Sequence, residues 1–264
     1  MYSSAMNYCN LPPWAIASLH FNREPQPLKI QGLGRPLKML LEKLQPLSSQ
    51  AERAALFHDF MDVRFQLHQW EREDTPSSRK ALKNSYLRFL RGWLFDSNAV
   101  EGAVLKGWAE SRLGLPPIFH GEPIGDIHSR AYFRYTQERM KGLARTNAIY
   151  SQFDLLYGYV QYELVRSFED QTHLTLYRGI YDFEEHQVVE KKDKSNFVLR
   201  LNNLNSFTDD FEKAWEFGSR VIEARIPLQK VFFKSGLLPK SLLKGEDEFI
   251  VIGGEYEVKV LIGG

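Results

Sequence analysis

Two glutamates one residue apart are the side chains of this chain best suited to do chemistry. Glu246 and Glu248 flank Asp247 in an acidic run that leads into the apolar stretch 249–252. Because side chains alternate between the two faces of a β-strand, we expect both glutamates on one face and Asp247 on the other. Paired carboxylates can stabilise the positive charge that develops when a glycosidic bond breaks. Most acidic runs are solvated surface segments, so this interpretation depends on residues elsewhere in the chain.

An arginine near the end of a strand-like stretch, residues 174–179, is the next candidate. Arg178 follows Leu174 and Leu176 on the same strand face, so a guanidinium ends an otherwise apolar face. A buried guanidinium is costly without a partner, and its planar fork matches a phosphate or a carboxylate. The partner could also be a structural acid of the protein itself. Gly179 could let a ligand approach the backbone closely, or it could be a turn residue.

A Ser-Phe-Thr sequence follows a second strand-like stretch, residues 197–205. The hydroxyls of Ser206 and Thr208 could bond to a neighbouring carboxylate, and Phe207 could stack on a flat heterocycle. Thr208 could also cap the short helix predicted to begin near Asp209, which is compatible with a ligand contact. An arginine, then Ser-x-Thr, then Glu-x-Glu, each at a strand end, favours a site that grips a dinucleotide and cleaves a glycosidic bond.

The two glutamates suit different parts of such a reaction. Cleavage of nicotinamide from ribose builds positive charge at C1′, and a fixed carboxylate such as Glu248 favours this oxocarbenium-like state. Glu246 could hold or deprotonate an incoming guanidine nucleophile. An arginine is normally fully protonated, and clustered like charges raise the pKa of one carboxyl group, which helps a base.

Composition argues against several other classes of protein. The 264 residues suffice for one large domain or two small ones, and the formal net charge of +1 argues against nucleic acid or an acidic membrane as the main partner. The single cysteine, Cys9, excludes an internal disulfide framework. The seven histidines show no ligand spacing, so no metal is expected. The motifs GxxxxGK[ST], HExxH and GxSxG are absent.

No targeting or spanning segment is visible either. The chain shows no basic segment followed by an apolar stretch at its start and no run of about 18 apolar residues. We therefore expect a cytoplasmic protein with no integral membrane segment.

The first part of the chain has helical patterns. Residues 1–47 carry much of the proline and are expected to be loop-rich. Ser49 and Glu52 then form a capping-box pattern, and apolar side chains recur at helical spacing beyond them. Helices are predicted within residues 49–70, 82–93, part of 96–115, and 129–169 with a possible break near Gly142.

After Asp170 the pattern changes to short β-branched and apolar runs. Strands are predicted at residues 173–181, 197–202, 220–226, 249–252 and 256–262. Gly253-Gly254 is expected to form a tight hairpin turn between the last two. We predict an α+β fold with a helical region at residues 1–170 and a β-rich catalytic core at residues 171–264, integrated in one domain.

The ordered motifs Tyr-Arg-Gly, Asn-Ser-Phe-Thr and Glu-Asp-Glu resemble those of the arginine/serine/glutamate class of mono-ADP-ribosyltransferases. The spacing agrees, with about 28 residues from Arg178 to Ser206 and about 42 from Ser206 to Glu248. Further stretches are similar to the dinitrogenase reductase ADP-ribosyltransferase family, and the likeness covers nearly the full chain. These stretches include Gly-Trp-Leu-Phe-Asp-Ser-Asn at 92–98, Gly-Ala-Val-Leu-Lys-Gly-Trp at 102–108 and Glu-His-Gln-Val-Val-Glu at 185–190.

The resemblance implies a helical region packed on a split β-sandwich, with NAD as co-substrate in the cleft and no metal. It implies transfer of ADP-ribose to an arginine of dinitrogenase reductase, the iron protein of nitrogenase, which reversibly switches off nitrogen fixation. It further implies control by a PII signalling protein.

The resemblance also implies residue roles. Arg178 would contact the phosphates of NAD, Gly179 the nicotinamide amide and Glu248 the nicotinamide ribose. Phe207 would lie near the nicotinamide, and Ser206 and Thr208 would also belong to the NAD-binding set. Ser206 would orient Glu248, and Glu246 would face the target arginine. Asp96, Asn98 and Lys106 lie in family-like stretches without an assigned role. Two alternatives remain open: an NAD glycohydrolase that uses water as acceptor, and a catalytically silent protein that binds nitrogenase or a regulator.

Overall fold

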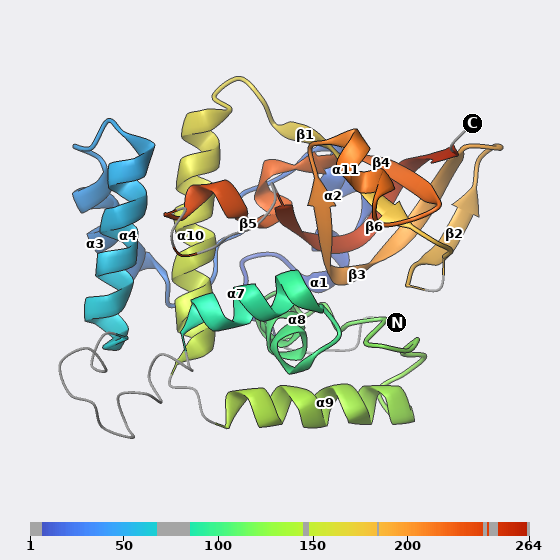
Figure 1. Cartoon of the computed structure of the whole chain (residues 1–264), viewed down its shortest axis with the longest axis horizontal. Coiled ribbons are helices and arrows are strands. Elements are labelled where there is room, and N and C mark those ends of the chain that lie inside the picture. The colour runs from blue at the N-terminus through green and yellow to red at the C-terminus, as the bar shows by residue number, and fades with distance from the viewer. Residues whose placement is uncertain are drawn as a thin grey trace.

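The fold is seen in a computed structural model, which describes residues 7–67, 85–144, 148–183, 185–239, 242 and 248–262. Helices dominate the chain up to residue 167, and one antiparallel sheet follows. Figure 1 shows α3, α4 and α10 side by side at one end of the molecule, with α7, α8 and α9 beneath the sheet. The predicted α+β class is therefore confirmed.

The helical elements agree with the sequence patterns except near the start. Their bounds are α1 Pro13–Ile16, α2 Leu19–Arg23, α3 Gly34–Leu44, α4 Gln50–Phe65, α7 Tyr86–Phe95, α8 Val100–Leu113, α9 Arg130–Leu143, α10 Ile149–Ser167 and α11 Phe211–Trp215. The expected break near Gly142 is confirmed, because α9 ends at Leu143. The proline-rich lead is more helical than predicted, because it contains α1, α2 and α3. Pro13 is compatible with a helix because it occupies the first turn of α1, where its missing N–H costs nothing. Ser18 caps α2 by accepting a hydrogen bond from the Phe21 N–H.

In the described part of the chain, six strands form the sheet in the order β2-β3-β1-β4-β6-β5, and β3 also pairs with β6. Their bounds are β1 His173–Ile180, β2 Gln187–Lys191, β3 Asn196–Thr208, β4 Arg220–Pro227, β5 Val231–Lys234 and β6 Glu248–Ile262. Because β6 pairs with β3 as well as with β4 and β5, the sheet curls back on itself into a small barrel-like shape (Figure 1). Strands β2 and β5 were not predicted: β2 is exposed along its whole length, and β5 has only four residues.

The predicted hairpin turn at Gly253-Gly254 is wrong. Both glycines lie inside β6, which continues without a turn to Ile262. A Cβ atom at Gly253 would lie 1.7 Å from the carbonyl oxygen of Asn202, and Gly254 has φ of +126°. The register of β3 against β6 shifts between Leu201 and Leu204, directly opposite. The two glycines therefore allow close approach at an irregularity in the ladder.

Among the residues that the structure describes, one hydrophobic core joins the helices to the sheet. The ring of Trp108 on α8 lies 4.5 Å from that of Phe232 on β5, and Phe153 on α10 packs against the same phenylalanine. An ion pair is buried within the helical part, where the Arg53 guanidinium donates to both carboxylate oxygens of Glu163 at 2.6 and 2.9 Å. Arg53 also donates to two backbone carbonyls, so its charge is well compensated.

Replacement of Arg53 by methionine should destabilise the fold strongly, because it leaves the Glu163 carboxylate buried without its counter-charge. We expect a loss of about 3–5 kcal/mol in the free energy of unfolding, measured by urea denaturation. The control is Arg23→Met, which removes an exposed ion pair with Glu257. That change should cost about 1 kcal/mol or less. Equal losses for the two variants would contradict this account of the core.

Candidate active site

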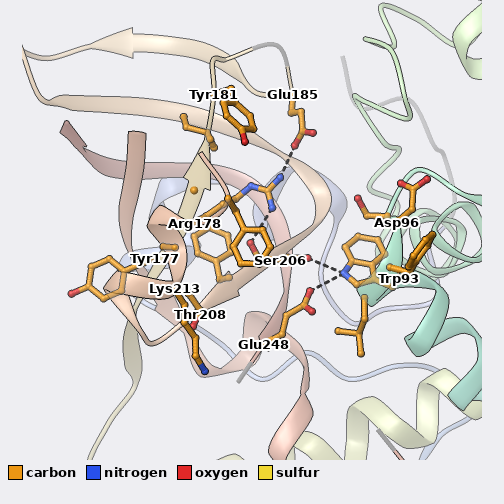
Figure 2. A pocket seen from close by; sticks show the side chains of 18 of the residues that line it. Trp93, Asp96, Tyr177, Arg178, Tyr181, Glu185, Ser206, Thr208, Lys213 and Glu248 are labelled. Atoms are coloured by element: carbon orange, nitrogen blue, oxygen red, sulfur yellow. Dashed lines mark hydrogen bonds and ion pairs between the residues drawn. The ribbon is translucent and has the colours of Figure 1, made fainter. Parts of the chain in front are cut away.

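A cavity of about 800 Å³ lies between the end of α7 and the adjoining parts of β1, β3 and β6. This volume is in the range of pockets that bind cofactors and other small molecules. Six of the residues predicted to bind a dinucleotide line it: Arg178, Gly179, Ser206, Phe207, Thr208 and Glu248. Figure 2 shows Arg178, Ser206 and Glu248 in this one pocket, facing Trp93. Glu246 and Asp247 lie outside the described residues.

Strand pairing explains how distant residues meet. Thr208 is opposite Glu248 in the antiparallel pair of β3 and β6, and it is also opposite Tyr177 of β1. Residues that face each other across an antiparallel pair project from the same side of the sheet, and so do residues two positions apart. Ser206, Thr208 and Glu248 therefore share one face.

Arg178 is fixed by the protein and still has a free donor. Its Nη1 donates to the carbonyl oxygen of Ser206 at 3.0 Å, and its Nη2 pairs with Glu185. Glu185 is thus a structural acid that pairs with Arg178, and it lines the same cavity. The Nε–H of Arg178 is buried and has no hydrogen-bond partner among the described residues. An unsatisfied buried donor on a cation suits an anionic ligand atom.

Gly179 permits close packing of the chain on itself. A Cβ atom there would lie 2.1 Å from the carbonyl oxygen of Ala214. The glycine therefore lets α11 sit directly on β1, beside the cavity. Any larger residue would push this helix away and change the wall next to Arg178.

The alternative role of Thr208 as the cap of α11 is wrong. Asp210 is the cap, and its Oδ1 accepts hydrogen bonds from the N–H groups of Glu212 and Lys213 at 2.9 and 3.3 Å. Thr208 instead accepts from the Asp210 N–H through its Oγ1 at 3.1 Å. Phe207 is only 2% exposed, so most of its ring belongs to the core.

Trp93, near the end of α7, lines the cavity, although the sequence pattern only placed it at the end of the predicted helix 82–93. Its indole Nε1 donates to Ser206 Oγ at 2.9 Å and to Glu248 Oε1 at 3.2 Å (Figure 2). The backbone N–H of Glu248 donates to Ser235 Oγ at 3.0 Å. The one sequence signal for Trp93 was its place in the family-like stretch 92–98.

Asn98 and Lys106, which had no assigned role, support the wall of the cavity. Lys106 Nζ donates to Asn98 Oδ1 at 2.9 Å and to the Phe119 carbonyl oxygen at 3.1 Å. The Asn98 N–H donates to Asp96, which lines the cavity. Burial lowers the pKa of Lys106 to about 7. These bonds tie the segment 96–98 to α8.

The described part of the chain contains neither a metal-binding cluster nor a membrane-spanning helix. No group of three or more His, Cys, Asp or Glu side chains there could hold a metal ion. None of the helices described is long and apolar enough to cross a bilayer.

Comparisons with known proteins match nearly the whole chain. Residues 6–260 match the model of the family described as dinitrogenase reductase ADP-ribosyltransferase. The chain is 40% identical over 257 residues to a Rhodospirillum rubrum protein named NAD(+)–dinitrogen-reductase ADP-D-ribosyltransferase, covering 96% of this chain and 93% of that protein. No solved structure matches significantly. Matches of this extent show that the chain belongs to the dinitrogenase reductase ADP-ribosyltransferase family.

Proposed function

We propose that this protein transfers ADP-ribose from NAD to an arginine of dinitrogenase reductase and so switches off nitrogen fixation reversibly. The main support is that Arg178, Ser206 and Glu248 meet in one cavity in a chain of this family. The relative from Rhodospirillum rubrum carries this activity in its name. The cavity adds a geometric observation to the family relationship, because strand pairing brings the three side chains together.

The cavity has the chemistry that NAD requires. Arg178 would bind the phosphates, since its buried Nε–H still needs an acceptor. Gly179 would lie at the nicotinamide amide, with Phe207, Ser206 and Thr208 beside the ring. NAD would supply the ribose C1′ and nicotinamide as the leaving group.

Glu248 would carry the main electrostatic task of the reaction. It would hold a ribose hydroxyl and stabilise positive charge at C1′ while the bond to the nicotinamide nitrogen breaks and the electron pair leaves with the nicotinamide. This corresponds to an oxocarbenium-like transition state. Glu246 would accept the proton that the acceptor guanidine loses as its nitrogen bonds to C1′.

The finer expectations rest mainly on the family. Control by a PII signalling protein and a cytoplasmic location belong to the same proposal. We include in this proposal a split β-sandwich of the mono-ADP-ribosyltransferase type, with NAD in its cleft. Its support is the long strand β6, which pairs with β3, β4 and β5 and thus serves both halves of the curled sheet.

Glu248→Gln should retain NAD binding and lose most of the transfer activity. The amide is nearly isosteric with the carboxylate but carries no charge to stabilise the transition state. We expect kcat to fall by about 10²- to 10³-fold or more. Labelled NAD and purified dinitrogenase reductase measure transfer, mass spectrometry identifies the modified arginine, and calorimetry measures NAD binding. Near-normal turnover would remove Glu248 from the mechanism.

Glu246→Gln should separate transfer from hydrolysis. If this carboxylate serves only the acceptor, the variant will still release nicotinamide from NAD but will no longer label dinitrogenase reductase. Glu169→Gln, an exposed change after α10, is the matched control. An equal fall in both reactions would show that Glu246 is not specific for the acceptor. If the native chain releases nicotinamide without labelling the protein, the glycohydrolase is favoured. If it forms neither product, a silent binder is favoured.

Arg178→Lys should weaken NAD binding although the positive charge is kept. Lysine cannot reproduce a fork that reaches the Ser206 carbonyl, Glu185 and a ligand together. We expect the Kd for NAD to rise by about 10- to 100-fold, the range for losing a hydrogen bond to a charged group. Calorimetry with the Glu248→Gln variant as background prevents turnover during the titration. An unchanged Kd would show that Arg178 serves only Glu185.

A further inference from the structure

A single indole N–H connects two residues of the proposed active site. Trp93 Nε1 is within hydrogen-bond distance of both Ser206 Oγ, at 2.9 Å, and Glu248 Oε1, at 3.2 Å. These two acceptors come from β3 and β6, whereas Trp93 comes from α7 in the helical part of the chain. The helical part thus supplies a donor directly to the catalytic strands.

Trp93 is held firmly enough to act as a positioning group. Its side chain is 3% exposed and belongs to the continuous core. The ammonium of Lys106 lies 6.0 Å from the centre of its ring, and Lys106 is itself bonded to Asn98 and the Phe119 carbonyl. The direction of the indole N–H is therefore set by packing on several sides.

We propose that Trp93 is a positioning residue for cleavage of the nicotinamide–ribose bond, because its N–H holds the Ser206 hydroxyl and the Glu248 carboxylate in the arrangement that the reaction needs. This inference rests on the proposed function of the cavity. An indole nitrogen is a donor only, so both oxygens must act as acceptors toward it. Ser206 keeps its own proton for a further bond, and Glu248 receives a fixed donor that favours the ionised carboxylate.

A buried tryptophan N–H usually finds some partner, so an ordinary structural role is the competing explanation. Trp108 provides that comparison within the same chain. It is fully buried, and its Nε1–H donates to Asp154 Oδ1 at 2.8 Å. Neither Trp108 nor Asp154 lines the cavity. Trp93 differs because both of its acceptors, Ser206 and Glu248, line the cavity.

The kinetic test compares Trp93→Phe with Trp108→Phe, since each change keeps an aromatic ring and removes the N–H. For Trp93→Phe we expect kcat for ADP-ribose transfer to fall by about 10- to 100-fold, as for loss of a hydrogen bond to a charged group, with little change in the KM for NAD. Trp108→Phe should lower the melting temperature and leave kcat unchanged. Equal effects on kcat, or an effect of Trp93→Phe on KM alone, would overturn the inference.

The pH profile gives a readout that lost packing would not move. Without the indole donor the Glu248 carboxylate is harder to ionise, so the acid limb of kcat should shift to higher pH in Trp93→Phe and stay in place in Trp108→Phe. The other charged groups that line the cavity are Asp96, Arg178, Asp182, Glu185 and Lys213, and they are the same in both variants. An unmoved acid limb in Trp93→Phe would contradict the role.

A double-mutant cycle tests whether the effect passes through Glu248. In the Glu248→Gln background, Trp93→Phe should cause little further loss of kcat, because the charge that it stabilises is already gone. If the fold-loss of kcat in the double variant equals the product of the two single fold-losses, Trp93 acts independently of Glu248.

A measurement without turnover separates this inference from the proposed function. The chain has five tryptophans, so its nitrogen–proton NMR spectrum should contain five indole signals, and Trp93→Phe identifies one of them. That signal should shift in both Ser206→Ala and Glu248→Gln while the Trp108 signal stays in place. An unshifted Trp93 signal would disprove the shared hydrogen bond even if the native chain transfers ADP-ribose. The shift without any transfer by the native chain would support the hydrogen bond and count against the proposed function.

Discussion

The antiparallel pairing of β3 with β6 is the constraint on which the site depends. It places Thr208 opposite Glu248 and so brings the Ser206 hydroxyl to the same face as that carboxylate. The pairing is costly to form, because a long chain segment must be closed before the strands gain their hydrogen bonds. Gly253 and the irregularity opposite it let the two strands stay in contact over their length. Without this register the acid would face another part of the molecule.

The helical part completes the cavity. Its α7 carries the indole of Trp93 to the two strands, and the segment after α7 forms one wall. Lys106 supports this wall from inside the core, at the cost of burying an ammonium group. Hydrogen bonds to Asn98 and to a backbone carbonyl offset part of that cost, and the lowered pKa of Lys106 reflects the remainder. The helices and the sheet are thus joined by polar contacts as well as by the apolar core.

The arginine of the cavity is oriented by acceptors of the protein itself. Arg178 contacts Glu185 and the Ser206 carbonyl, which orients the guanidinium and leaves its Nε–H toward no protein acceptor in the described chain. Arg178 can therefore pair with a structural acid of the protein and bind a ligand at the same time. A carboxylate partner can hold the arginine in place for a ligand that the remaining donor binds.

The sequence by itself determined the α+β class, the helices with clear apolar stripes and the strands that contain Arg178 and Ser206, because these patterns depend on local periodicity. It did not predict β2, whose side chains are all exposed, and it misassigned Gly253 as a turn because a glycine pair has the same local preference in a turn and in a bulge. Only the tertiary structure decided that Trp93 reaches Glu248. Contacts between residues so far apart depend on the packing of whole elements, which no local pattern encodes.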